Sequence, residues 1–473
     1  MEIRQFDLPG LGHLSALLID EAAGIAAVID PRRDVDTYLD EASHRGLRIS
    51  HVLETHLHND YVSGAHELAE STGAHHVIGA GAELATPYLP VRDGDVLDIG
   101  RLRVMILETP GHTPEHVSYV VSDTGDPSRG ARPPTALADF GPSAIFTGGS
   151  LLVGSVGRTD LLGADNARPY ARQMYRSLHE KLLPHPDGVG VLPTHGAGSL
   201  CSRGTGDAWS STIGVERLTD PLLAIEDPDA FADALLADQP AFPRYFARMR
   251  GTNQAGPRIL GTIPTPRALD GPAVRAVLAG GGLLIDLRPA AEHAAAFVPG
   301  SVSLPADPSF GTWLGWVVEP DRPLVLLLPH PQAWDDAVRQ ALRVGYESVV
   351  GYLDGGLAAW QAAGGGVARG LAMSIRELAS ALDGGEPPLV LDVRQADEYA
   401  IAHVPGARHL MAGDVPDRLA ELPRDRPIAT ICASGYRASV AASLLRRAGF
   451  REVAWIEGGV PGWQAAGLPV AVS

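Results

Sequence analysis

ETHLHNDYVSG, at residues 54–64, is the stretch from which the N-terminal half of the chain is best interpreted. It follows the apolar run of residues 49–53, which predicts a short buried strand, so His56 and His58 are expected where that strand ends. Residues two apart on an extended chain point to the same side. Paired neutral imidazoles suit zinc or iron. Taken alone, a His-x-His pair is explained equally well by a surface role.

Two further histidines follow apolar runs in the same way. His112 comes after residues 104–107, and His195 comes after residues 189–192. Each lies next to glycine, as the histidines of a layered α/β domain with its site on one rim would. Together they favour a metal centre over a chance pair.

These residues resemble the metallo-β-lactamase superfamily. Its His-x-His-x-Asp-His signature corresponds to residues 56–61, with Asp60 in place and Tyr61 where two-metal hydrolases keep a histidine. The resemblance implies an αββα sandwich over residues 1–240, with a strand hairpin over residues 15–29. It also implies that Asp30 orients the metal-binding histidines from behind. Without a histidine at position 61, a mononuclear site is favoured.

Length and composition set the outer limits. A chain of 473 residues is too long for one core, and about 150 residues per domain suggests three domains. The formal charge of −18 argues against nucleic-acid or anionic-membrane partners. No apolar run reaches the ~20 residues that span a bilayer, and the start has no secretory signal pattern. Two cysteines, Cys201 and Cys432, indicate free thiols in a reducing cytoplasm.

The stretches that connect the expected domains are rich in Gly, Pro and charged residues. Residues 123–142 predict an exposed loop. Residues 241–262 follow helical pieces broken by proline and are interpreted as an extension or linker. Residues 364–370 contain four glycines and form the boundary between the last two domains.

The C-terminal half contains an internal repeat. Asp286-Leu287-Arg288 recurs as Asp392-Val393-Arg394, and the Gly-Gly-x3-Trp motif of residues 355–360 recurs at residues 458–463. Alternating strand and helix patterns predict a small, doubly wound parallel sheet in each unit. The units resemble rhodanese domains, and we place them at residues 263–366 and 371–473.

The second repeat contains the residues for cysteine chemistry. Cys432 follows an apolar strand and precedes a predicted helix over residues 438–448. A helix N-terminus and its backbone N–H groups stabilise a bound anionic sulfur. The loop between them has the length of the sulfurtransferase active-site loop, so the resemblance implies a persulfide on Cys432. The residues that would cradle or pair with it are Ala433, Ser434, Gly435, Tyr436 and Arg437.

The first repeat lacks this chemistry. Aligning the Gly-Gly-x3-Trp motifs places residues 329–334, PHPQAW, at the loop position, with no cysteine and no arginine at the matching ends. We therefore interpret it as a pseudo-rhodanese with a structural or docking role.

Taken together, the three domains resemble the multidomain bacterial persulfide dioxygenases. That family implies one Fe(II) per chain, held by His56, His112 and an aspartate, but the aspartate position is Gly149 here. Iron would then need help from His58, Asp60, His195 or an exogenous ligand. Zinc or no metal at all are the alternatives. The resemblance also implies substrate contacts from Arg158 and Tyr61, and a sulfur relay through Cys201, for which an inert thiol is the alternative.

The leading hypothesis is a cytoplasmic enzyme of sulfide detoxification. It would oxidise a low-molecular-weight thiol persulfide with O2 and pass sulfane sulfur through Cys432 to an acceptor. The alternatives are a sulfurtransferase or persulfide carrier with a degenerate metal site, and a glyoxalase-II-like thioester hydrolase. The resemblance is compatible with a homo-oligomer.

Overall fold

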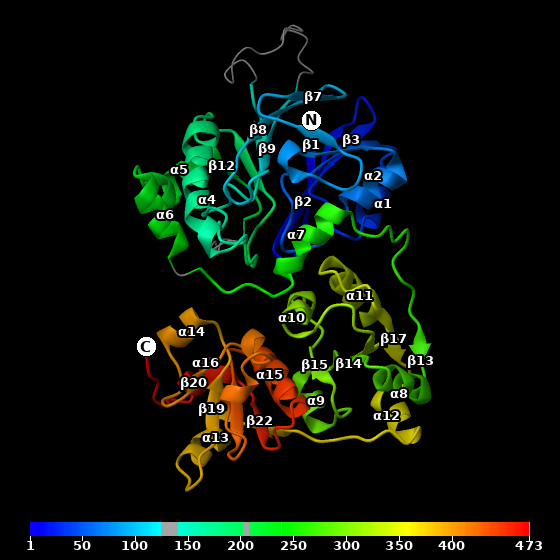
Figure 1. Cartoon of the computed structure of the whole chain (residues 1–473), viewed down its shortest axis with the longest axis vertical. Helices are drawn as coiled ribbons and strands as arrows, with labels where there is room; N and C mark the ends of the chain where they lie inside the picture. The colour runs from blue at the N-terminus through cyan, green and yellow to red at the C-terminus, as the bar shows by residue number, and fades with distance from the viewer. Residues whose placement is uncertain (124–140, 202–207, 238, 473) are drawn as a thin grey trace. The chain divides into compact units, whose positions relative to one another are not determined.

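A computed structural model describes residues 1–123, 141–201, 208–237 and 239–472 (Figure 1). The chain forms two compact units, Met1–Ile263 with Leu342–Gly345, and Pro264–Ala341 with Tyr346–Ser473. The loop expected at residues 123–142 lies almost wholly outside the described residues. Within the described ranges, no helix combines the length and apolar character needed to cross a membrane.

Two mixed sheets form the centre of the first unit. The first sheet contains, in spatial order, β1 (Glu2–Leu8), β2 (His13–Asp20), β3 (Ile25–Ile29), β4 (Arg48–Leu53), β5 (His75–Gly79) and β6 (Leu89–Val91). The second contains β12 (Ser211–Thr212), β11 (Gly190–Pro193), β10 (Ala144–Gly148), β9 (Val117–Asp123), β8 (Leu102–Glu108) and β7 (Val96–Ile99). The predicted hairpin is β2 and β3, which pair antiparallel.

Both faces of the first sheet are covered, and β2 shows how the sequence achieves this. All of its residues are buried. Ala16 and Leu18 contribute to the core that also contains residues of the second sheet, whereas Leu17 and Ile19 join a core with helix residues. Successive side chains on a strand point to opposite faces, so one apolar strand serves both layers.

Helices complete the αββα sandwich. The first sheet is covered by α1 (Asp36–His44) and α2 (Ala65–Thr72), whose buried side chains share a core with β2 to β4. The second is covered by α4 (Ala164–Arg176) and α6 (Pro228–Leu236), which share a core with β8 to β11. The π-helical turn η2 (Ser177–Leu182) continues α4, and α5 (Ile213–Thr219) follows β12. The predicted sandwich is confirmed.

The region that we interpreted as an extension or linker contains α7 (Phe246–Ala255). This helix is integrated into the first unit, which continues to Ile263. The side-chain amide of Asn253 donates to the carbonyl oxygens of His58 and Tyr61, and its Oδ1 accepts from the N–H of Ser63. Helix α7 therefore braces the loop that follows β4.

The first repeat of the second unit forms a parallel sheet with the order β13-β17-β16-β14-β15. Its elements are β13 (Ala268–Leu269), α8 (Gly271–Ala279), β14 (Leu283–Asp286), α9 (Ala290–Ala295), β15 (Val302–Ser303), α10 (Phe310–Val317), β16 (Leu324–Leu327), α11 (Ala333–Arg343), β17 (Val349–Leu353) and α12 (Gly356–Ala362).

The second repeat has the equivalent order β18-β22-β21-β19-β20. Its elements are β18 (Leu371–Met373), α13 (Ile375–Leu382), β19 (Leu389–Asp392), α14 (Ala396–Ile401), β20 (Arg408–His409), β21 (Ile428–Ile431), α15 (Tyr436–Arg447), β22 (Val453–Ile456) and α16 (Gly459–Ala465). The two predicted doubly wound domains are confirmed as a fold.

The two repeats contact each other within the second unit. Helix α15 of the second repeat lies beside β15 of the first. The N–H of Ser303 donates to Ser443 Oγ at 3.0 Å, and the hydroxyls of Ser303 and Ser439 are 2.7 Å apart. These buried polar groups satisfy one another across the contact.

Candidate metal centre and cysteine loop

Three histidines from distant parts of the sequence meet at one end of the sandwich. His56 follows β4, His112 follows β8 and His195 follows β11, and all three are buried. One ring nitrogen from each lies within 4.8 Å of the others, close enough for a shared metal ion. Nε2 of His56 and Nε2 of His195 are 3.5 Å apart although the residues are separated by 139 positions.

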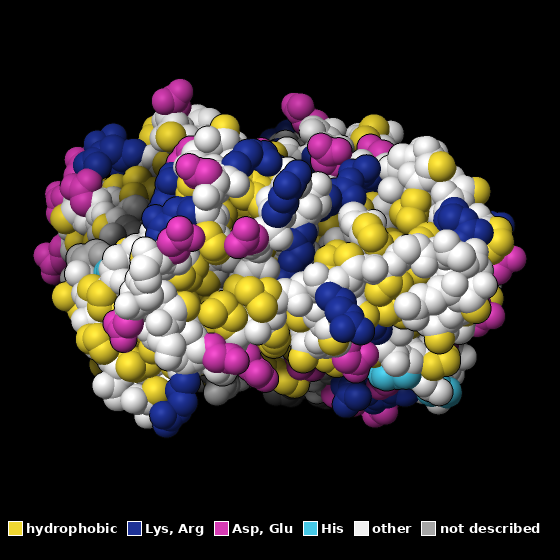
Figure 2. Space-filling model, turned by 90° about the horizontal axis from the view of Figure 1, so that it is seen from below, with side chains coloured by type: hydrophobic (Ala, Val, Ile, Leu, Met, Phe, Trp, Pro, Cys, Tyr) yellow, Lys and Arg dark blue, Asp and Glu magenta, His cyan; other side chains and the backbone are white. Residues whose placement is uncertain are grey.

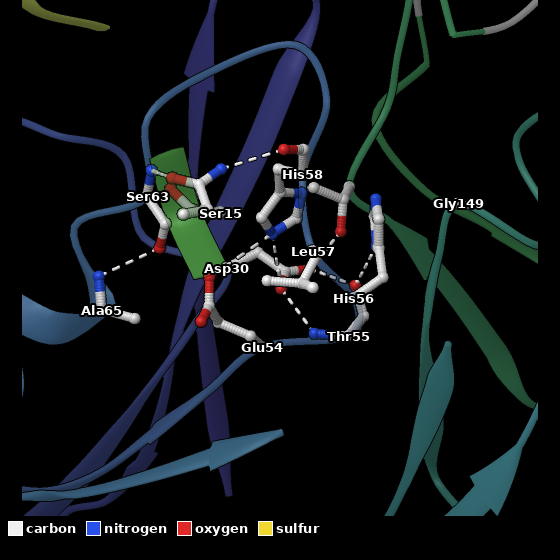
Figure 3. Close-up of polar contacts among 12 residues, drawn as sticks. Ser15, Asp30, Glu54, Thr55, His56, Leu57, His58, Ser63, Ala65 and Gly149 are labelled. Carbon is white, nitrogen blue, oxygen red and sulfur yellow. Dashed lines mark hydrogen bonds and ion pairs between the residues drawn. The ribbon is translucent and has the colours of Figure 1, made fainter. Parts of the chain in front are cut away.

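The other ring nitrogen of each histidine faces a specific neighbour. Nδ1 of His56 lies 2.9 Å from Thr55 Oγ1, whose proton goes to Asp30 Oδ2 (Figure 3). Nδ1 of His112 donates to the carbonyl oxygen of Arg158 at 2.8 Å. Nδ1 of His195 lies 3.3 Å from Asp60 Oδ2. Partners at Nδ1 fix the tautomer and leave Nε2 as the ligand atom, so the role expected of Asp30 is supported by its contact through Thr55.

The surroundings keep two of these imidazoles neutral. Burial, together with the neighbouring His195, lowers the pKa of His112 to about 3. Burial and the neighbouring histidines hold the pKa of His56 well below its usual range. A neutral imidazole is the form that binds a metal ion. Nε2 of His112 is buried without a hydrogen-bond partner. A buried ring nitrogen without a hydrogen-bond partner, close to ring nitrogens of two other histidines, is satisfied when a metal ion binds to it. These three residues therefore fit a metal ion.

His58 is arranged differently from the other signature histidine. Its Nε2 lies 3.3 Å from Asp30 Oδ1 (Figure 3) and 3.9 Å from Glu54 Oε1. Burial lowers its pKa, but Asp30 and Glu54 outweigh this effect and raise the pKa overall. His58, Asp60 and His195 form a second candidate ligand group that shares His195 with the first. In this arrangement Nε2 of His58 faces the carboxylate of Asp30.

Tyr61 was predicted to contact substrate, and its surroundings do not support that role. The side chain is 1% exposed, its ring stacks on His58 at 4.4 Å, and its hydroxyl donates to the carbonyl oxygen of Asp30 at 3.3 Å. Tyr61 therefore packs against His58 in the interior of the domain.

The place at Gly149 is not open, contrary to what the missing aspartate suggested. A Cβ atom there would lie 2.3 Å from Cδ2 of His112, so the His112 ring occupies the space. The backbone N–H of Gly149 donates to Nε2 of His116 at 2.9 Å, and Nδ1 of His116 lies 2.9 Å from Thr109 Oγ1. Sequence reasoning missed His116, although its position four residues after His112 was a signal.

A second missed contributor is the pair of Glu115 and Arg250. Glu115 Oε1 accepts from the N–H of Leu57, inside the signature loop, at 2.9 Å. Arg250 of α7 donates to both carboxylate oxygens of Glu115, each at 2.9 Å. No local motif marks these residues, because the contacts join positions 58 and 135 residues apart.

Arg158 and Cys201 lie together beside the histidines. The guanidinium of Arg158 is buried, donates to both carboxylate oxygens of Asp160 at 2.7 and 2.8 Å, and donates to the carbonyl oxygen of Leu200. Cys201 is fully buried, and burial raises the pKa of its thiol well above the usual range. In this arrangement Arg158 is engaged within the protein, and Cys201 is a neutral thiol.

The predicted cysteine loop has a shape suited to holding a charged sulfur. The N–H of Gly435 donates to Cys432 Sγ at 3.0 Å, and α15 begins at the next residue, Tyr436. Gly435 has a φ of 101°, which favours glycine, and its carbonyl oxygen accepts from the indole of Trp455 at 2.7 Å. Ala433 and Ser434 form the outer part of the loop and are partly or fully exposed.

Arg437 and Glu398 form an ion pair beside this loop. Burial lowers the pKa of Arg437, but the hydrogen bond and charge of Glu398 outweigh it and raise the pKa. The ring centres of Tyr436 and Trp313 are 6.2 Å apart, and Trp313 belongs to α10 of the first repeat. The pseudo-rhodanese thus contributes a wall next to the cysteine loop.

At the matching position of the first repeat, no nucleophile is present. Residues 329–334 connect β16 to α11, as residues 432–437 connect β21 to α15. Trp334 stands where Arg437 stands in the second repeat, and it is buried with its indole donating to the carbonyl oxygen of Pro264 at 3.1 Å.

Family comparisons agree with this architecture. Residues 9–126 match the model of the metallo-beta-lactamase superfamily, and residues 272–363 and 374–466 match the rhodanese-like domain. A hydroxyacylglutathione hydrolase of Methylobacillus flagellatus is 30% identical over 237 residues, 44% of this chain and 82% of that protein. The mitochondrial persulfide dioxygenase ETHE1 of Bos taurus is 27% identical over 228 residues, 47% of this chain and 76% of that protein. A crystal structure titled as a metallo-beta-lactamase from Staphylococcus aureus has a TM-score of 0.66 and 29% identity, and covers 74% of this chain and 98% of its own.

The chain therefore belongs to the metallo-β-lactamase superfamily. Within it, this chain is a fusion of a metallo-β-lactamase domain, homologous to persulfide dioxygenases, with tandem rhodanese-like domains. The homology supports an enzyme of sulfide metabolism with a metal site.

Proposed function

We propose that the protein is a persulfide dioxygenase and sulfurtransferase that oxidises a low-molecular-weight thiol persulfide in its N-terminal domain and transfers sulfane sulfur through Cys432. In the first reaction a persulfide, O2 and water give a thiol and sulfite. The outer sulfur atom loses four electrons, and O2 accepts them.

The observation that carries the proposal is the convergence of His56, His112 and His195. Their ring nitrogens lie within 4.8 Å of one another. His195 thereby takes the third ligand place that the family gives to the aspartate missing at Gly149. Together these three imidazoles would supply the protein ligands of one iron ion.

The iron would supply sites where persulfide and O2 meet. The residues of the chain position that chemistry. Thr55, Asp60 and the carbonyl oxygen of Arg158 orient the three imidazoles. The buried location of the histidines excludes bulk water from the metal side of the site.

In the second rhodanese-like repeat, the thiolate of Cys432 would attack the outer sulfur of a persulfide or of thiosulfate. The new bond joins Sγ to that sulfur, the original S–S bond breaks, and a thiol or sulfite leaves. Attack by sulfite on the Cys432 persulfide would then give thiosulfate and return the thiolate. The N–H of Gly435 and the N-terminus of α15 face the sulfur that carries the charge.

Two alternatives lead to different chemistry. A thioester hydrolase is favoured by the identity to a hydroxyacylglutathione hydrolase. Against it stand the pairing of His58 with Asp30 and the absence of a bridging carboxylate at Gly149, which a second metal ion would need. A sulfurtransferase with a metal-free N-terminal domain would keep the Cys432 chemistry and lose oxygen uptake.

The test is elemental analysis of anaerobically purified protein together with O2 uptake after addition of glutathione persulfide. We expect about one iron per chain and O2 uptake, both lost in His112→Ala and in His195→Ala. His75→Ala, an exposed histidine in the same domain, is the matched control. Metal-free protein without O2 uptake, but with intact thiosulfate-to-cyanide transfer, would leave the sulfurtransferase.

The variant Gly149→Asp distinguishes two models of the metal site. In one, three histidines complete the ligand set; in the other, the site lacks only its aspartate ligand. A side chain at this position would collide with the ring of His112. We therefore expect the aspartate to lower iron content. An increase in iron content and O2 uptake would instead mean that His195 is not the third ligand.

A further inference from the structure

A cavity of about 680 Å³ lies between the two repeats of the second unit, away from both sites described above. Its walls come from the segment that follows α9, from the connection into β18, and from the end of α15. Helix α15 has 12 residues and begins at the cysteine loop, so its far end lies about 18 Å from Cys432. The volume is in the range of small-molecule sites, about 300–1,000 Å³.

The polar part of the lining is strongly basic. Four arginines, Arg369, Arg446, Arg447 and Arg451, line the cavity together with two glutamates, Glu386 and Glu452, which leaves a formal charge of +2. The whole chain carries −18, so this concentration of positive charge runs against the composition. On the face drawn in Figure 2, dark blue basic side chains likewise lie among yellow hydrophobic ones.

Arg446 is a charged group whose burial is not compensated by a carboxylate. It is half-buried, and in the described part of the chain it forms no ion pair. One nitrogen donates to the carbonyl oxygen of Val453 at 3.0 Å. Burial lowers its pKa to about 10. A guanidinium held in this way gains stability when an anion enters beside it.

The remaining arginines leave donors available to the same space. Arg447 donates to the carbonyl oxygen of Gly300 at 2.6 Å, and burial lowers its pKa. Neither Arg369 nor Arg451 forms an ion pair or hydrogen bond within the described residues. Arginine forks suit the oxygens of a phosphate, and two net positive charges match a phosphate monoester dianion.

Apolar side chains form the rest of the lining. Phe297 and Phe450 are buried, and Leu371 is 55% exposed. The guanidinium of Arg446 lies 5.6 Å from the centre of the Phe297 ring, so charged and aromatic surfaces are adjacent. An inorganic ion would leave this apolar surface uncovered, whereas an organic ester would cover it.

We propose that this cavity binds an organic phosphate, with the phosphate on the arginines and the apolar portion against Phe297 and Phe450. This site is separate from the proposed function, because it uses neither the histidines nor Cys432. Its ligand class follows from the lining alone.

Calorimetric titration of the full-length protein with phenyl phosphate tests the proposal, with inorganic phosphate and phenol as its two halves. We expect saturable binding of phenyl phosphate at least about tenfold tighter than either half. Arg446→Met and Arg369→Gln should each weaken it by about tenfold or more. Within the described residues the side chain of Arg369 forms no hydrogen bond or ion pair, so Arg369→Gln tests the site even if Arg446→Met impairs folding.

Arg424→Met is the matched control, since Arg424 stacks on Phe450 at 4.3 Å but does not line the cavity. It should bind phenyl phosphate as the unaltered protein does. Cys432→Ser should also bind normally, which separates this site from the sulfur-transfer loop. The proposal is overturned by the absence of saturable binding up to about 10 mM, or by equal affinities of the Arg446→Met, Arg369→Gln and Arg424→Met variants.

Discussion

The two rhodanese-like repeats share one fold and differ at the loop that precedes α11 in the first and α15 in the second. In both, an Asp–Arg pair lies at the end of a strand next to the central one: Arg288 pairs with Asp286 at the end of β14, and Arg394 pairs with Asp392 at the end of β19. In both, the arginine also donates to a carbonyl oxygen eight residues further on, of Ala296 at 2.8 Å and of Ala402 at 2.6 Å. Because the repeat without a cysteine keeps this network, we assign the Asp–Arg pair to the maintenance of the fold.

Only the second repeat has the residues for cysteine chemistry. Cys432, Arg437 and the indole of Trp455 converge on the loop, while the first repeat has Pro329, Trp334 and Tyr352 at the matching positions. The difference separates residues that fold a rhodanese domain from residues that make it react. Matched substitutions in the two repeats can test each assignment.

The largest expected effect is that of Cys432→Ser. Loss of the nucleophile should reduce thiosulfate-to-cyanide transfer by about a thousandfold or more. His330→Ala, in the equivalent loop of the first repeat, should leave the rate unchanged. Cyanide-dependent formation of thiocyanate measures both, and a large loss in the His330 variant would show that the first repeat takes part in catalysis.

Arg437→Met should have the next largest effect. A charge-assisted contact to an anionic sulfur donor is worth about 1.5–3 kcal/mol, so kcat/KM for thiosulfate should fall by about 10- to 100-fold. Arg437→Lys should recover part of it, because the charge remains and the fork is lost. The reciprocal Trp334→Arg should confer no activity on the first repeat in a Cys432→Ser background. If kcat/KM were unchanged in Arg437→Met, the role of Arg437 would be limited to its ion pair with Glu398.

Gly459→Ala and Gly356→Ala form a matched pair that isolates one steric contact. Both glycines have nearly the same backbone, with φ of 61° and 60°, so the strain of a left-handed alanine cancels in the comparison. A Cβ at Gly459 would lie 2.1 Å from the carbonyl oxygen of Ala433, whereas at Gly356 the nearest atom is 3.9 Å away. The extra clash should cost about 1–3 kcal/mol.

Transfer activity and thermal unfolding of the two variants provide the measurement. Gly459→Ala should lose more activity, because the carbonyl oxygen of Cys432 lies only 2.4 Å from the added atom. Equal losses of transfer activity in both variants would mean that the cysteine loop moves to accommodate the alanine side chain without any additional loss of activity.

The sequence predicted those parts of the molecule that depend on local pattern. His56, His112 and His195 were found because each follows an apolar strand, and the repeats were found because their motifs recur at nearly one offset. The sequence left the third ligand open among His58, Asp60, His195 and an exogenous group, because the choice depends on distances such as the one between His195 and His56 across 139 positions. The bracing by Asn253 and the filling of the Gly149 position by His112 are likewise tertiary contacts. No periodicity or motif in the sequence indicates these contacts.

The smallest expected effect concerns the indole of Trp455. Trp455→Phe removes the hydrogen bond to the carbonyl oxygen of Gly435 and keeps an aromatic ring in the core. Loss of one such bond costs about 0.5–1.5 kcal/mol, so kcat should fall by about two- to tenfold while KM changes little. Tyr352→Phe, at the matching position of the first repeat, should leave kcat unchanged.

A fall in kcat confined to Trp455→Phe would mean that the position of Gly435, and with it the N–H that faces Cys432, limits the transfer step. An equal fall in both variants would mean that the aromatic residue on this strand acts through general packing, and the division between folding and reacting residues would then lie closer to Cys432 and Arg437 alone.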